Sequence, residues 1–182
     1  MYSNFGLKSK SKVVSQFIFV ISLENRPTGM IPEFEPLRED EREVLLDAPV
    51  LVAILIAGAD GKIDKSEKKQ AVDIARTKQS RAREQLSDYF KIVGDRFEDR
   101  FFKLVEELPA DTEERNQKVS IELRKLNFIL PKIDKNFGIK LHASLKDLAK
   151  KIAEASGGVL GYLSVSYEEA KLMELRMIKD PS

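Results

Sequence analysis

The fold is decided by residues 43–58, which read EVLLDAPVLVAILIAG. From Pro49 to Ala57 every side chain of this stretch is apolar. A helix that is apolar on all sides must be surrounded by protein, so we expect a central helix from Glu43 to Ala57. Pro49 should lie near its start or at a kink, and Gly58 should end it.

Amphipathic helical patterns follow on the C-terminal side of this stretch. Apolar residues recur three or four positions apart, which places them on one face of a helix. The expected helices cover residues 64–80, 86–93, 95–108, 111–130, 141–156 and 166–178, with breaks at Gly94, Pro109 and Pro131. We therefore predict an all-α, single-domain bundle of six or seven helices around the apolar central helix.

The composition of the 182 residues agrees with this class and excludes several functions. There are 31 Lys and Arg against 30 Asp and Glu, and the net charge of +1 argues against nucleic-acid or membrane-surface binding as the main function. The absence of Cys rules out disulfides and Cys-bound metals, and the single histidine, His142, rules out two-His metal centres. No phosphate loop or dinucleotide-binding turn occurs, which disfavours most common enzyme classes, and we expect a non-enzymatic protein.

Residues 1–39 differ from the rest of the chain. Lysines at positions 8, 10 and 12 precede an apolar run at residues 13–21, and prolines follow at 27, 32 and 36. The run is shorter than the ~20 residues of a membrane span, so no span is expected. It is interpreted as an arm that packs on the helical body, a weak signal-like segment, or an extension upstream of a start at Met30. We divide the chain into this arm and a helical domain at residues 40–182, in a cytoplasmic protein.

Two junctions of the chain share a pattern of helix end, glycine turn, one apolar residue and acidic helix start. The first contains DGKIDKSE at residues 60–67, and the second contains VSYEE at residues 165–169. Residues 60–67 match the second half of an EF-hand loop, in which oxygen atoms bind Ca²⁺. The first and third loop positions fall on Ile56 and Gly58, which carry no ligand side chain, so a complete EF-hand is rejected.

The acidic residues of both junctions are the candidate metal ligands. Hard divalent cations such as Ca²⁺ and Mg²⁺ require several oxygen atoms that converge. The candidate ligands are Asp60, Asp64 and Glu67 from the first junction, with Glu168 and Glu169 from the second if the two junctions pack together. The alternative is that all of them only cap helices, because a Glu three residues after an N-cap satisfies a free backbone N–H.

The run LVAILIAGADGKIDKSE at residues 51–67 resembles the signature of TerB-like, tellurite-resistance-associated domains. Residues 152–169 are similar to the second junction of that family, although Gly161, Ser164 and Ser166 stand where a more acidic turn would match better. The resemblance covers residues 40–180. It implies an all-helical domain, an acidic cluster that binds divalent cations, and a non-enzymatic role in bacterial stress-response assemblies with membrane-associated protein partners.

Other polar and aromatic residues favour packing or solvent exposure over chemistry. Lys and Arg gather at residues 62–83, which favours a solvated helix face and, next, an acidic protein partner over nucleic acid. His142 is expected to be packed or half-exposed rather than catalytic, because no Ser or carboxylate lies at a spacing from it that indicates a catalytic partner. In each of the pairs Tyr89-Phe90 and Phe101-Phe102, one ring should enter the core and the other should lie at its margin.

Three functions from different classes remain at this stage. The first is a TerB-like interaction or sensor module that binds a divalent cation. The second is a structural helical adaptor in which the acidic residues are only caps. The third is a metal-dependent hydrolase, which would need a deep pocket with convergent carboxylates and a well-placed base.

Overall fold

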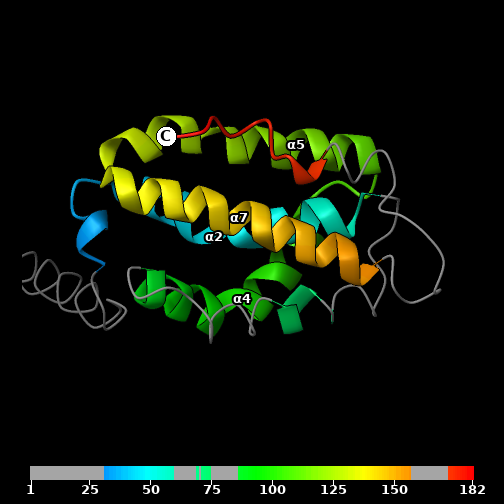
Figure 1. The fold of residues 1–182 in the computed structure, drawn as a ribbon. Coiled ribbons are helices and arrows are strands. Elements are labelled where there is room, and N and C mark those ends of the chain that lie inside the picture. The colour runs from blue at the N-terminus through cyan, green and yellow to red at the C-terminus, as the bar shows by residue number, and fades with distance from the viewer. Residues whose placement is uncertain (1–30, 60–68, 70, 75–85, 157–171) are drawn as a thin grey trace, which may run out of the picture. The chain divides into compact units, whose positions relative to one another are not determined.

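The computed structural model describes residues 31–59, 69, 71–74, 86–156 and 172–182, and residues 31–182 form one compact unit (Figure 1). Within this described part the chain is helical and contains no strand, which confirms the all-α prediction. The elements are η1 (Pro32–Phe34), α2 (Glu39–Ala57), α4 (Ser87–Glu107), α5 (Thr112–Arg124), α6 (Leu126–Ile129), η3 (Leu130–Lys132) and α7 (Lys135–Ser156). The predicted total of six or seven helices stays a prediction, because the described residues do not cover every expected helix.

Helix α2 is the centre of the fold, as its sequence predicts. Every residue from Leu45 to Ala57 is buried, and α4, α5, α6 and α7 all contact this helix. It begins at Glu39, four residues before the expected start, because acidic residues in the first turn favour a helix N-terminus. The Glu41 side chain accepts a hydrogen bond from the Arg38 backbone N–H at 3.1 Å, which closes this end.

Pro49 lies inside α2 rather than near its start. Its ring nitrogen carries no hydrogen, so the carbonyl four residues earlier, that of Leu45, lacks its usual helical donor. The buried Tyr89 hydroxyl donates to this carbonyl at 2.7 Å. The side chain from α4 therefore supplies the hydrogen bond that the proline removes from α2.

Helix α4 corrects the expected break at Gly94. The helix runs without interruption from Ser87 to Glu107, so the two helices expected on either side of Gly94 are one. A glycine inside a helix costs only about 1 kcal/mol relative to alanine, and burial outweighs that cost. The buried residues that form the continuous apolar face of α4 are Tyr89, Phe90, Val93, Phe97, Phe101 and Leu104.

The aromatic pairs on α4 give one confirmed and one wrong prediction. Phe101 is fully buried while Phe102 is 41% exposed, as expected. Tyr89 and Phe90 are both buried, so neither ring lies at a margin. Tyr89 also makes edge-to-face contacts with Phe34 and Phe137, which brings the N-terminal ends of α4 and α7 to the segment before α2.

Helices α5, α6 and η3 divide the single helix expected from Asp111 to Pro131. The Asp111 carboxylate accepts from the Glu114 backbone N–H at 2.9 Å, which confirms the predicted cap. After Arg124 some backbone hydrogen bonds connect residues three apart, as in a 3₁₀ turn. An example is the bond that the Phe128 N–H donates to the Lys125 carbonyl. Pro131 then lies in η3, at the end of this helical stretch.

Helix α7 begins at Lys135, six residues before the first apolar position of the expected pattern. Asp134 caps it by accepting from the Phe137 backbone N–H at 2.8 Å. The four periodic leucine and isoleucine side chains, at residues 141, 145, 148 and 152, are all buried. This confirms the predicted apolar face.

The C-terminal segment departs from the predicted helix over residues 166–178. Helical structure is described at residues 172–173 and gives way to turns from Glu174. Leu175 has a φ of 48°, a left-handed conformation that cannot continue a right-handed helix. The Leu175 and Ile178 side chains are still buried, so the apolar spacing predicted burial correctly but not the backbone.

Residues 31–39, which belong to the predicted arm, contribute to the core of the helical unit. The side chains of Ile31, Phe34 and Leu37 are buried in it. The Arg42 guanidinium donates to the Phe34 and Leu37 carbonyls at 3.1 and 3.0 Å, which fixes this turn against the start of α2.

Candidate functional site

The candidate metal ligands lie outside the described residues. This applies to Asp60, Asp64 and Glu67 in the first junction and to Glu168 and Glu169 in the second. The structure describes the two helices from which the junctions start, since α2 ends at Ala57 and α7 ends at Ser156.

These two helix ends lie at the same end of the helical unit. Phe34, which precedes α2, contacts the Phe137 ring at 6.4 Å between centroids, and Phe137 is in the first turn of α7. Figure 1 shows α2 and α7 running in the same direction, and the two helices contact each other. Helices of 19 and 22 residues differ in length by only ~5 Å, so their C-terminal ends lie at a similar level.

The C-terminal end of α2 is anchored by a buried arginine. Arg115 of α5 is 5% exposed and donates from its guanidinium to the Gly58 carbonyl at 2.7 Å. It also donates to the Ala110 carbonyl at 3.3 Å. A cation at a helix C-terminus satisfies a carbonyl that has no helical donor and interacts favourably with the helix dipole. Arg115 thereby fixes the backbone two residues before the acidic stretch at Asp60.

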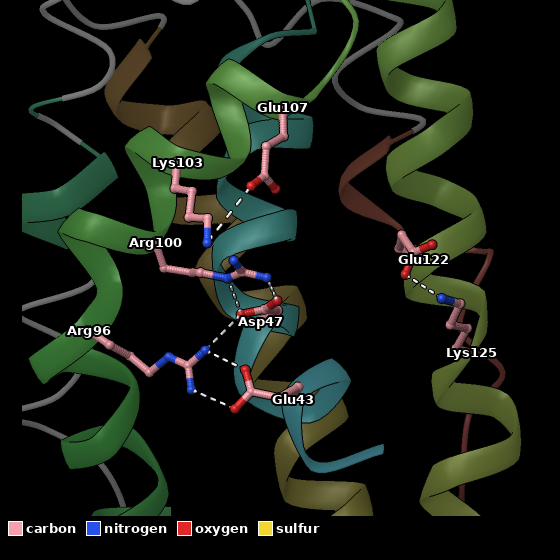
Figure 2. Close-up of polar contacts among 8 residues, drawn as sticks. All are labelled: Glu43, Asp47, Arg96, Arg100, Lys103, Glu107, Glu122 and Lys125. Carbon is pink, nitrogen blue, oxygen red and sulfur yellow. Dashed lines mark hydrogen bonds and ion pairs between the residues drawn. The ribbon is translucent and has the colours of Figure 1, made fainter. Parts of the chain in front are cut away.

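A cluster of four charged side chains joins α2 to α4 (Figure 2). The Arg96 guanidinium binds both carboxylate oxygens of Glu43, at 3.1 and 2.6 Å. The Arg100 guanidinium binds both oxygens of Asp47, at 2.9 and 2.5 Å. Arg96 also reaches Asp47 at 3.3 Å, so the two bidentate pairs form one network.

The electrostatics of this cluster identify it as a structural connection. The Arg96 hydrogen bond lowers the pKa of Glu43, and the Glu43 carboxylate raises the pKa of Arg96. The pKa of Arg100 is raised chiefly by its hydrogen bond to Asp47. The guanidinium groups of Arg96 and Arg100 each occupy both oxygens of one carboxylate, so the cluster joins α2 to α4 through bidentate ion pairs.

His142 occupies a packed position on α7. Its side chain is buried, and its Nε2 atom has no hydrogen-bond partner among the described residues. Burial lowers the pKa of His142, an effect that Asp180 opposes and Lys146 reinforces. These facts agree with the expected packed histidine.

Three other expectations concern the basic stretch, metal-binding groups and membrane-spanning helices. Of the basic stretch at residues 62–83, Lys69 is described, and it is exposed. No described group of three or more His, Asp or Glu side chains could hold a metal ion. No described helix is long and apolar enough to cross a membrane.

The polar contacts that anchor α2 were missed by the sequence interpretation. Glu43 and Asp47 are four residues apart, as are Arg96 and Arg100, so each pair lies on one helix face, and that matched spacing is a signal for the cluster. No comparable signal exists for Arg115, which is one charged residue among many on α5.

Comparison of the chain with protein-family models, curated proteins and solved structures gave no match.

Proposed function

We propose that this chain is a non-enzymatic, TerB-like interaction or sensor module of a bacterial stress-response system that binds one divalent cation. The ligands in this proposal are Asp60, Asp64 and Glu67, together with Glu168 or Glu169. The main support is the acidic sequence of residues 60–67, directly after a helix end that the Arg115 guanidinium holds in place.

The arrangement of α2 and α7 adds a second line of support. The two acidic junctions follow helix ends at the same end of the unit, so a cation shared between them would connect α2 to α7. Calcium and magnesium both prefer carboxylate and carbonyl oxygens, and this chain has no cysteine and one histidine to offer instead. Cation binding would then stabilise the folded state and order the surface around both junctions.

The proposed partner is a protein with an acidic surface. The support is the concentration of Lys and Arg at residues 62–83, next to the first junction. A cation bound there would add to this positive charge, so partner binding should strengthen when the site is loaded.

A thermal-unfolding titration with Ca²⁺ and Mg²⁺ tests the cation site. At a cation concentration of ~100 Kd, a single site stabilises the fold by about 2.7 kcal/mol, which raises the Tm of a chain of this size by roughly 5–10 °C. Asp60→Ala combined with Glu67→Ala should abolish the rise. The control variant is Asp99→Ala with Glu106→Ala, which removes two exposed carboxylates from α4 and should leave the rise intact.

The same experiment separates the module from a structural adaptor. If the acidic residues are only caps, Asp64→Ala and Ser166→Ala each lower stability by ~1 kcal/mol with or without the cation. An unchanged melting curve of the natural chain at about 5 mM cation, roughly five times the ~1 mM Kd of weak calcium sites, refutes the cation site.

A further inference from the structure

The end of the chain, residues 174–182, forms a strap that lies across α6 and α7 and is drawn in red in Figure 1. The Asn127 side chain of α6 bonds the strap backbone twice. Its Nδ2 donates to the Met177 carbonyl at 2.9 Å, and its Oδ1 accepts from the Lys179 N–H at 2.7 Å. Leu175 and Ile178 of the strap are buried. Residues 174–182 are called the C-terminal strap below.

The C-terminal strap contacts one face of α7 at two places, two helical turns apart. A Cβ atom on Gly138 would lie 4.0 Å from the Pro181 side chain, and Lys146 pairs with Glu174 at 3.8 Å. Residues 138, 142 and 146 are four positions apart, so they share one face of the helix. His142 lies on this face between the two contacts, and the strap therefore covers it.

His142 is held in surroundings that suit only its neutral form. It is 7% exposed, and its Nε2 atom has no hydrogen-bond partner among the described residues. A neutral imidazole accommodates such an atom as its unprotonated nitrogen, whereas an imidazolium carries a hydrogen on both nitrogens. A buried charge whose donor lacks an acceptor costs free energy, so protonation is unfavourable while the strap covers the ring.

The charged groups that act on His142 are Lys146 on α7 and Asp180 on the strap. Lys146 lies one turn away and repels an imidazolium. The Asp180 carboxylate attracts one, but it is exposed to water and accepts a hydrogen bond from the Ser182 N–H at 2.9 Å. Burial has the largest effect on the pKa of His142 and lowers it. Desolvation therefore outweighs the attraction to Asp180.

The C-terminal strap also contains a strained residue. Leu175 has a φ of 48°, which is unfavourable for a leucine. Two backbone bonds hold this turn, from the Leu175 N–H to the Leu172 carbonyl at 3.0 Å and from the Ile178 N–H to the Leu175 carbonyl at 2.8 Å. A strained conformation persists only while surrounding contacts impose it, so release of the strap relieves the strain.

We propose that the C-terminal strap is a proton-sensitive latch, in which protonation of His142 releases residues 174–182 from α6 and α7. The imidazolium gains water only when the strap leaves, so protons favour the open form by linkage. Because a free histidine has a pKa of about 6.5, acidification from about pH 7.5 to 5 can raise the ratio of open to closed strap by up to ~30-fold. Opening uncovers the apolar surface beneath Leu175 and Ile178.

Native-state hydrogen exchange, followed by NMR at about pH 7.5 and 5, tests the latch. The probes are the backbone amides of Ile178 and Lys179, and buried amides of α2 are the reference. After correction for the intrinsic pH dependence of exchange, strap protection should fall by up to ~30-fold at the lower pH. It should also be lower than α2 protection at both pH values, because the strap opens without global unfolding. Strap protection that does not change with pH, or that equals the protection of α2, overturns the proposal.

Two variants attribute the pH dependence to His142. His142→Gln keeps a polar side chain that does not titrate, so strap protection should become independent of pH. Hydrogen bonds from Ser182 lower the pKa of Asp180, so its carboxylate stays charged over this range, and Asp180→Asn should keep the fall in protection. Protection of α2 in each variant verifies the fold. A fall that persists in His142→Gln, or one that disappears in Asp180→Asn, overturns the assignment of the latch to His142.

Discussion

Replacing Tyr89 with phenylalanine tests how α2 accommodates a proline in its interior. The Tyr89 hydroxyl donates to the Leu45 carbonyl at 2.7 Å, at the position where Pro49 cannot donate. Burial raises the pKa of Tyr89 well above its usual value, so the phenol stays protonated and remains a donor. Tyr89→Phe keeps the ring and removes only this donor, leaving a buried carbonyl without a partner.

The expected cost follows from that unsatisfied carbonyl. A buried polar group that loses its hydrogen-bond partner costs about 1–3 kcal/mol, more than the ~1 kcal/mol net value of the bond itself. For a chain of this length each kcal/mol corresponds to roughly 2–4 °C in Tm. We therefore expect Tyr89→Phe to lower the free energy of unfolding by about 1–3 kcal/mol, with little change in the denaturant m-value.

A double-mutant cycle measured by urea unfolding attributes this loss to its cause. Pro49→Ala returns a backbone N–H that can bond the Leu45 carbonyl, so Tyr89→Phe should cost much less in the Pro49→Ala background. The coupling should be at least ~0.5 kcal/mol, the size that contacting residues show. Equal losses in both backgrounds would refute the idea that Tyr89 replaces the donor that Pro49 lacks.

Three further substitutions probe the other polar contacts. Arg115→Met should lower stability by ~1.5–3 kcal/mol in urea unfolding, because the Gly58 carbonyl loses a charged donor; a loss below ~0.5 kcal/mol would contradict the anchoring role. Asp47→Asn should lower stability by ~1–3 kcal/mol, since its carboxylate binds two partly exposed guanidinium groups. Glu43→Gln should lower stability by less than ~1 kcal/mol. A larger loss for Glu43→Gln than for Asp47→Asn would be inconsistent with the burial of the two carboxylates. Burial lowers the pKa of His142 from its usual value, so the unfolded chain binds the proton more tightly, and stability should fall as the pH drops through the range in which a free histidine is protonated. Thermal unfolding between pH 7 and 5 should show a smaller fall for His142→Gln, and parallel curves for the two proteins would rule this out.

Most of the core could be predicted from the sequence, because apolar spacing reports burial directly. The apolar run of α2 identified the central helix, and the four periodic side chains of α7 are all buried. Burial was predicted even where the backbone was not, as at Leu175, whose left-handed conformation has no sequence signal in a leucine. Gly94 failed as a helix stop because tertiary packing on both sides of it outweighs a weak intrinsic preference.

Contacts between helices could not be predicted to the same degree. The Tyr89 and Arg115 hydrogen bonds join residues 44 and 57 positions apart, and each depends on which helices become neighbours. The ion-pair cluster joining Glu43 and Asp47 to Arg96 and Arg100 carries a matched spacing of four, but the spacing alone does not say which pairs meet. The candidate metal ligands lie outside the described residues and remain a prediction from the sequence.

The most direct test of the proposed function is a crystal structure of the full chain grown with Mn²⁺, examined by anomalous diffraction. Manganese prefers the same oxygen ligands as magnesium and calcium. The proposal predicts one strong anomalous peak bound by carboxylates of Asp60, Asp64 and Glu67 and by Glu168 or Glu169. Carboxylates that point apart at these residues, with no peak between them, would contradict it.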